Sequence, residues 1–185
     1  MAMKLKHDFW IGWALGAIVL SSCWDQTTSP RQQPDIKREI SLKAVPLDKT
    51  KVVMGQTVYV PIYSHIYHYN SKDQVMNLSA TLSIRNTDLT NSIIITSVRY
   101  YDSDGKLIRH DIKSPVELKP LASTDFFIAA DDTSGGSGAN FIVEWVAEKT
   151  VYDPVIEAVM ISTSSSQGIS FISPAKVLKQ HKMQK

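Results

Sequence analysis

The residue best suited to covalent modification is Cys23, the only cysteine in the chain of 185 residues. It follows Leu20, Ser21 and Ser22, and a bulky aliphatic residue, two small residues and a cysteine are typical of the end of a bacterial lipoprotein signal. We therefore expect cleavage before Cys23 and acylation of its thiol. Two alternatives stay open, namely a free thiol in a signal peptide that is cut elsewhere and a buried thiol in a cytosolic protein.

The residues before Cys23 have the other features of an export signal. Lys4 and Lys6 make the start positive, and residues 9–20 form an uncharged apolar run. This run is shorter than the about 20 residues that a membrane-spanning helix needs. We expect a lipoprotein signal peptide over residues 1–22, and then a lipidated, flexible tether over residues 23–43 that is rich in Gln, Thr, Ser and Pro. The lipid on Cys23 would hold the chain to a membrane of the cell envelope, on its extracytoplasmic side.

A second group of residues could bind a partner by contact. Between Val58 and Tyr69 the even positions are mostly aliphatic and the odd positions mostly aromatic. In one extended strand these side chains would lie on opposite faces. Pro61 places the segment on an edge strand or at a bulge. The candidate binding surface consists of Tyr59, Tyr63, His65, Tyr67 and Tyr69, and would suit a glycan, a peptide or an envelope protein. The alternative, which the strand propensity of Tyr favours, is that the tyrosines pack under loops.

Metal binding is the alternative chemistry for some of these residues. His65, Asp131 and Asp132 are the candidate ligands, and the glycine-rich segment that follows Asp132 resembles one calcium-binding repeat of a β-helix. A single copy of that repeat cannot stack, and stacking forms such sites. The segments 102–105 and 135–138 are better explained as loops in which Gly supplies positive φ. We expect no metal and no cofactor, with the three named residues as the alternative metal site.

The chain contains only partial matches to known catalytic motifs. Gly136, Ser137 and Gly138 resemble a nucleophile elbow, but that elbow needs a strand, a turn and a helix, and the chain shows no helical periodicity. His110 and Asp111 are adjacent and would diverge on a strand, and Glu144 is predicted to face solvent. We expect a protein without enzymatic activity, with an uncharacterised hydrolase as the third alternative.

The elements that must position these residues are strands. Residues 78–85 alternate between apolar and polar side chains, and residues 92–101, 123–130, 140–147, 155–162 and 168–173 also read as strands. A turn at residues 102–105 predicts a hairpin with residues 106–110. The pattern predicts an all-β fold, an antiparallel immunoglobulin-like β-sandwich of about seven to eight strands over residues 44–178.

Composition limits the partners. The chain has 20 Lys and Arg against 18 Asp and Glu, so its charge gives no reason to expect nucleic acid. One cysteine cannot form an internal disulfide, so packing must stabilise the domain. Residues 179–185 form a basic C-terminal tail, for which we favour a frayed, solvated terminus over contact with an anionic surface. The oligomeric state is not predicted.

Three segments carry a resemblance to a known family: Thr57–Tyr67, Val98–Lys106 and Asp131–Phe141. They resemble the domain of unknown function 3124 family, and the resemblance covers residues 52–178. It implies an exported or lipid-anchored bacterial protein, often cyanobacterial, and it implies no activity and no catalytic residues. We expect a lipid-anchored envelope protein whose non-catalytic β-sandwich binds or scaffolds an envelope partner. The alternative is a periplasmic domain that binds a metal or a small ligand.

Overall fold

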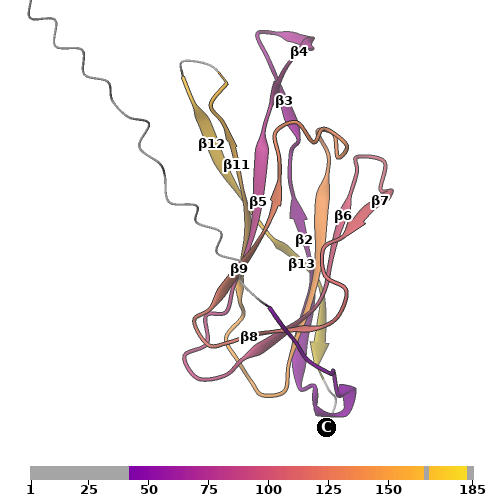
Figure 1. Cartoon of the computed structure of the whole chain (residues 1–185), viewed down its shortest axis with the longest axis vertical. Coiled ribbons are helices and arrows are strands. Elements are labelled where there is room, and N and C mark those ends of the chain that lie inside the picture. The colour runs from indigo at the N-terminus through magenta and orange to yellow at the C-terminus, as the bar shows by residue number, and fades with distance from the viewer. Residues whose placement is uncertain (1–41, 165–166, 183–185) are drawn as a thin grey trace, which may run out of the picture. The chain divides into compact units, whose positions relative to one another are not determined.

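The structure, a computed structural model, describes residues 42–164 and 167–182, which belong to one compact unit. The signal peptide, Cys23 and most of the tether lie outside the described residues. The described chain is built from thirteen strands, and every pairing between them is antiparallel. The predicted all-β antiparallel sandwich is confirmed (Figure 1). No helix in the described ranges is long and apolar enough to cross a membrane.

The larger sheet has seven strands in the order β1-β8-β6-β10-β2-β13, with β7 also paired to β6. Its strands are β1 (Lys43–Ala44), β2 (Met54–Pro61), β6 (Ile93–Tyr101), β7 (Leu107–His110), β8 (Val116–Leu118), β10 (Asn140–Ala147) and β13 (Lys176–Lys182). The 3₁₀ helix η1 (Lys49–Lys51) lies between β1 and β2 and is capped by Asp48, whose side chain accepts a hydrogen bond from the Thr50 N–H.

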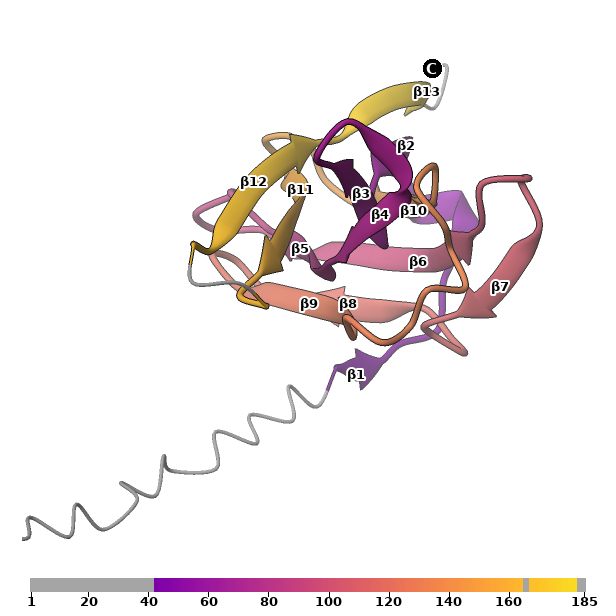
Figure 2. The ribbon, with the colours of Figure 1, turned by 90° about the horizontal axis from the view of Figure 1, so that it is seen from above.

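The second sheet has four strands in the order β12-β11-β5-β9, and a two-stranded hairpin, β3-β4, extends from one end of the sandwich (Figures 1 and 2). The strands are β5 (Ser79–Arg85), β9 (Ser123–Ile128), β11 (Val155–Ser162) and β12 (Ile169–Pro174), with β3 (His65–His68) and β4 (Ser71–Asn77) in the hairpin. The strands predicted at 140–147 and 155–162 have the predicted bounds, and the hairpin around residues 102–105 is confirmed.

The core forms where the alternating strands of the two sheets face each other. Ala80, Leu82 and Ile84 of β5 are buried, while the residues between them are half-buried. On β10, the side chains of Phe141 and Trp145 are fully buried. The Trp145 indole N–H donates to Gln56 Oε1 at 3.3 Å, so the one polar group of this large side chain is satisfied inside the core.

The structure has more strands than the predicted seven to eight because several short segments are added to the sheets as strands. The two residues of β1 and the three of β8 are too short for a period to be visible in the sequence. The run from Val58 to Tyr69 is also two strands, since β2 ends at Pro61 and β3 begins at His65. β2 is an interior strand, which corrects the predicted edge position. Pro61 is tolerated at its last position because β13 begins only at Lys176, opposite Tyr59.

The C-terminal segment is ordered as a strand. β12 belongs to the four-stranded sheet, and the chain continues through Ala175 into β13, which pairs with β2 in the larger sheet (Figure 2). The predicted frayed tail is therefore wrong for residues 179–182, and the predicted domain boundary at residue 178 falls inside β13. The backbone hydrogen bonds to β2 order this basic segment.

Candidate binding surface

The aromatic residues predicted as a binding surface follow one side of the chain from β2 into the hairpin. On the other side, the even positions pack into or toward the core: Val58, Val60, Ile62 and Ser64 are buried. The odd positions lie on the opposite side, as the alternation predicted: Tyr59 and His65 are half-buried, and Tyr63 and Tyr67 are exposed, an exposure that the sequence had left open. The alternation of faces thus continues across the break between β2 and β3.

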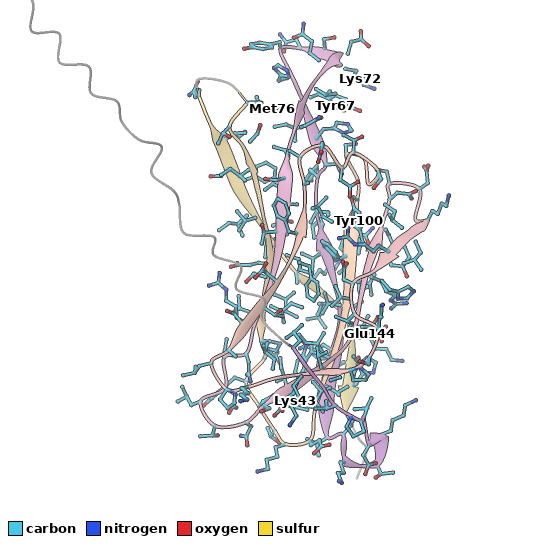
Figure 3. All side chains as sticks on the ribbon, in the orientation of Figure 1. Lys43, Tyr67, Lys72, Met76, Tyr100 and Glu144 are labelled. Atoms are coloured by element: carbon cyan, nitrogen blue, oxygen red, sulfur yellow. The ribbon has the colours of Figure 1, made fainter. Side chains whose placement is uncertain are left out.

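The hairpin presents one mixed face to solvent. His65 pairs with Asn77 and Tyr67 with Val75 across the two strands, so these four side chains share a face. The His65 and Tyr67 rings meet edge to face at 5.7 Å. Ile66, on the opposite face, packs against the core. Figure 3 shows Tyr67, Met76 and Lys72 on this hairpin, at one end of the sandwich.

The tip of the hairpin holds an aromatic residue in an unusual backbone conformation. Tyr69 and Asn70 both have positive φ, 54° and 59°. Two such residues between paired strands form the turn that matches strand twist, where Asn and Gly are the usual occupants. Asn70 is such an occupant, but a bulky residue with positive φ is a conformational outlier. The Tyr69 side chain is 80% exposed, and its ring lies 4.4 Å from that of His68.

One contact joins this surface to the four-stranded sheet. The ring of Tyr63 meets that of Phe171, on β12, edge to face with 5.8 Å between centroids. Phe171 lies more than 100 positions further along the chain, so no local pattern pairs it with Tyr63. We define the aromatic surface as Tyr63, His65, Tyr67, Tyr69 and Phe171. Tyr59 lies apart from it, on the outer face of the larger sheet between Lys176 and Ile142.

The glycine-rich loop between β9 and β10 holds the base of the hairpin. The Ile62 N–H donates to the Ala139 carbonyl at 2.9 Å, and the Ser64 N–H donates to the Gly136 carbonyl at 3.0 Å. Gly136 has φ of 73°, as predicted for a loop glycine. Gly135 is required by space, because a Cβ there would lie 2.0 Å from the Tyr100 hydroxyl oxygen.

Tyr100 lies under this loop (Figure 3). Its side chain is fully buried, its hydroxyl is 3.4 Å from Ser64 Oγ, and the Arg109 guanidinium lies 5.6 Å from the ring centroid. Burial raises the pKa of this phenol above its ordinary value of 10.0. Tyr100 is therefore a neutral, packed support for the loop and the hairpin.

The alternative metal site is not formed. No group of three or more His, Cys, Asp or Glu side chains gathers among residues 42–164 and 167–182. His65 lies on β3, while Asp131 and Asp132 lie in the loop after β9. The Asp132 carboxylate accepts hydrogen bonds from the N–H and the hydroxyl of Ser134, so it stabilises the turn.

Two charged groups on the larger sheet are paired instead of free. Glu144, predicted to face solvent, is half-buried and binds Arg99 of the neighbouring strand. Asp111 accepts a hydrogen bond from Arg109 Nε at 2.7 Å. Burial raises the pKa of the Asp111 carboxyl, and the neighbouring Arg109 opposes that shift.

A groove of about 600 Å³ lies on the outer face of the larger sheet. Glu144 and Val146 of β10 line it, with the segment before β2 on one side and β13 on the other. Lys49, Lys179 and His181 contribute positive or titratable groups, and His181 Nε2 lies 2.9 Å from Thr57 Oγ1. The sequence did not predict this groove, because it depends on how β13 returns to β2.

The fold and the surface together define a β-sandwich domain with a projecting aromatic hairpin. A family model described as "Protein of unknown function (DUF3124)" matches residues 55–178, more than half of the chain, and the chain belongs to this family. The predicted family membership is thus confirmed. No curated protein matches the chain. The crystal structure of Thermotoga maritima 1070 is similar at 13% identity and a TM-score of 0.37, and the match covers 65% of this chain and 92% of that one.

Proposed function

We propose that this chain is a lipid-anchored protein of the cell envelope, whose β-sandwich binds an envelope partner through the aromatic surface without catalysis. The partner is a protein, a peptide or a glycan, and the membrane attachment is the lipid on Cys23. No nucleic acid and no cofactor take part.

The observation that carries the binding role is Tyr69. A tyrosine with positive φ costs folding free energy of about 1–2 kcal/mol relative to a residue that tolerates this conformation. Its side chain gains little from packing, since it is 80% exposed. Backbone strain that is retained without a gain in packing is a feature of functional sites. Tyr67, 51% exposed on the same hairpin, extends the contact area.

Capture of envelope partners tests this role. Detergent extracts of the native envelope are passed over the tagged full chain and over a Tyr67→Ser, Tyr69→Asn double variant. Tyr152→Ser is the matched control, because Tyr152 is 70% exposed in the connection between β10 and β11, away from the hairpin. We expect the double variant to lose its partners and the control to keep them. Identical partners for all three proteins would remove the hairpin as the binding site.

The anchor is supported by the order of charge, apolar run and small residues before Cys23. Mass spectrometry of the native protein should find an acylated Cys23 at the mature N-terminus. Cys23→Ser should move the protein from the membrane fraction to the aqueous fraction. An intact Met1, or a mature start without fatty acid, would refute the anchor and leave the hairpin test unaffected.

The groove on the larger sheet favours small-ligand binding as a second candidate function. Neither Lys49 nor Lys179 has an ion-pair partner among the described residues, and both border an apolar floor that includes Leu47, Val52 and Val146. This arrangement suits an amphipathic carboxylate. Decanoate should raise the melting temperature of the protein by mass action. Lys179→Gln should reduce that rise, while Lys106→Gln, in the turn before β7, should not.

A further inference from the structure

The free edges of the two sheets differ in how they are protected. An edge strand presents unpaired N–H and C=O groups to any passing strand, and proteins protect edges with charges, bulges or cover. β13, the edge of the larger sheet, carries Lys176 and Lys179 and has a bulge between Val177 and Lys179. β9, one edge of the smaller sheet, carries Asp125, and Arg109 Nη2 donates to the Phe127 carbonyl at 3.5 Å.

β12, the other edge of the smaller sheet, has neither a charge nor a bulge, and Pro174 protects only its last position. Its six residues, Ile169–Pro174, include no charge. Its register with β11 is continuous from Ile169 to Pro174, without a bulge. No described strand pairs with its outer side (Figure 2). Ile172 is 60% exposed, so β12 is an uncharged edge without a bulge that also carries an exposed apolar side chain.

We propose that β12 pairs antiparallel with β12 of a second copy of this chain, so that the two four-stranded sheets become one continuous sheet across a two-fold axis. A two-fold interface places the same patch of both copies in contact. A charged edge would repel its own copy in that arrangement, and β12 is uncharged, so it is complementary to itself. Pro174 marks one end of the pairing because it has no N–H to donate.

The outer face of the sheet supports the same partner. Ile172, Val159, Thr81 and Phe127 lie in one row across the four strands, as their registers show. Pairing of two β12 strands would bring the exposed Ile172 side chains of the two copies near each other. Tyr63, packed against Phe171, would border the joint, so the two aromatic surfaces would lie on one assembly. The proposed dimer does not depend on the proposed partner binding, because it uses the backbone of β12.

Sedimentation velocity of the full chain in detergent, over a range of concentrations, tests the proposal. We expect a reversible dimer with a Kd in the micromolar range. A Ser170→Lys, Ile172→Lys double variant changes two exposed residues on the outer face of β12 and should weaken the dimer about tenfold or more, because like charges would then face each other.

Phe127→Lys is the matched control. Phe127 is 56% exposed in the same row, but at the opposite edge of the sheet, so this variant should keep the dimer. Urea unfolding of each variant checks that the monomer is folded. In hydrogen exchange, the β12 amides of the wild type should become more protected as concentration rises, and those of β13 should not.

Each other outcome overturns the proposal. A wild type that stays monomeric at all concentrations excludes the dimer. Equal loss of the dimer in Phe127→Lys would show that the sheet face forms the contact. A dimer unaffected by the β12 double variant would place the interface elsewhere. Protection of β12 in a monomer would show that another segment of the chain covers this edge.

Discussion

The two ends of the sandwich are built on different principles. At the end opposite the hairpin, the buried Asn86 donates from Nδ2 to the carbonyls of Asn91, Leu118 and Lys119 at 2.9, 3.1 and 3.0 Å. Asp88, next to it, accepts from the backbone N–H groups of Thr90 and Asn91 through Oδ1, and from Tyr152 through Oδ2. Two short side chains thus join three connections between strands.

At the hairpin end, hydrogen bonds fix the loop after β9, but the side chains beyond that loop are large and exposed. The loop after β9 holds the base of the hairpin, and beyond that base Tyr67 and Tyr69 extend into solvent. The two ends therefore differ in the interactions that stabilise them. One end uses buried hydrogen bonds to fix the fold, and that fixed fold allows the other end to keep a strained turn.

The substitution with the largest expected effect on the free energy of unfolding lies at the hydrogen-bonded end. Asn86→Ala removes the partner of three backbone carbonyls and should lower the free energy of unfolding by about 3 kcal/mol. Urea denaturation measures this loss. Asn77→Ala, on the exposed side of the hairpin, should change it by less than about 0.5 kcal/mol. Similar losses for both variants would contradict the difference between the two ends.

The next largest expected loss of stability concerns the loop after β9, which holds the base of the hairpin. Gly135→Ala places a methyl group against the Tyr100 hydroxyl and should cost about 2 kcal/mol of unfolding free energy. Tyr100→Phe removes that hydroxyl, so the double variant should recover part of the loss relative to Gly135→Ala. A double-mutant cycle in urea measures the coupling. Strict additivity would show that the two residues do not constrain each other.

Asp88 gives the hydrogen-bonded end a dependence on pH. Its pKa is lowered from the ordinary 3.8, mainly by the backbone N–H groups of Thr90 and Asn91. Since the folded state favours the carboxylate, this stabilisation is present above the ordinary pKa and is lost as pH falls through the lower folded pKa. Asp88→Asn should flatten the acid limb of a plot of stability against pH. The quantity to compare is the free energy of unfolding of the variant minus that of the wild type at each pH. The comparison is needed because the pKa of Asp48 is lowered as well, so Asp48 also makes stability depend on pH in both proteins.

The substitution with the smallest expected effect raises the free energy of unfolding instead of lowering it. Tyr69→Asn places at the hairpin tip a residue that tolerates positive φ, and should raise the free energy of unfolding by about 1 kcal/mol. Calorimetry measures this gain. Partner capture by the same variant should fall. A variant that is less stable than wild type would show that Tyr69 is retained for packing.

The sequence predicted what depends on local pattern. The period of two located β5, β10 and β11, and the glycines located the turns. The alternation of Tyr59, Tyr63 and Tyr67 with buried residues also followed from that period, even across the break after Pro61, where the N–H groups of Ile62 and Ser64 donate to carbonyls of the loop after β9.

What the sequence missed depends on contacts between distant segments. The basic residues after Ala175 show no apolar alternation, and they form a strand because β2 offers a free side. Phe171 joins the aromatic surface from the other sheet for the same kind of reason. The pairing of Glu144 with Arg99 needs the register of two strands more than 40 residues apart.

The pairing of β13 with β2 has a consequence for biosynthesis. β2, near the start of the domain, acquires its second neighbour only when residues 176–182 are available. The larger sheet therefore cannot be completed until residues 176–182 have been synthesised, because β2 lacks its second neighbour until then. Such a delay would leave one side of β2 unpaired throughout the synthesis of the residues that separate the two strands.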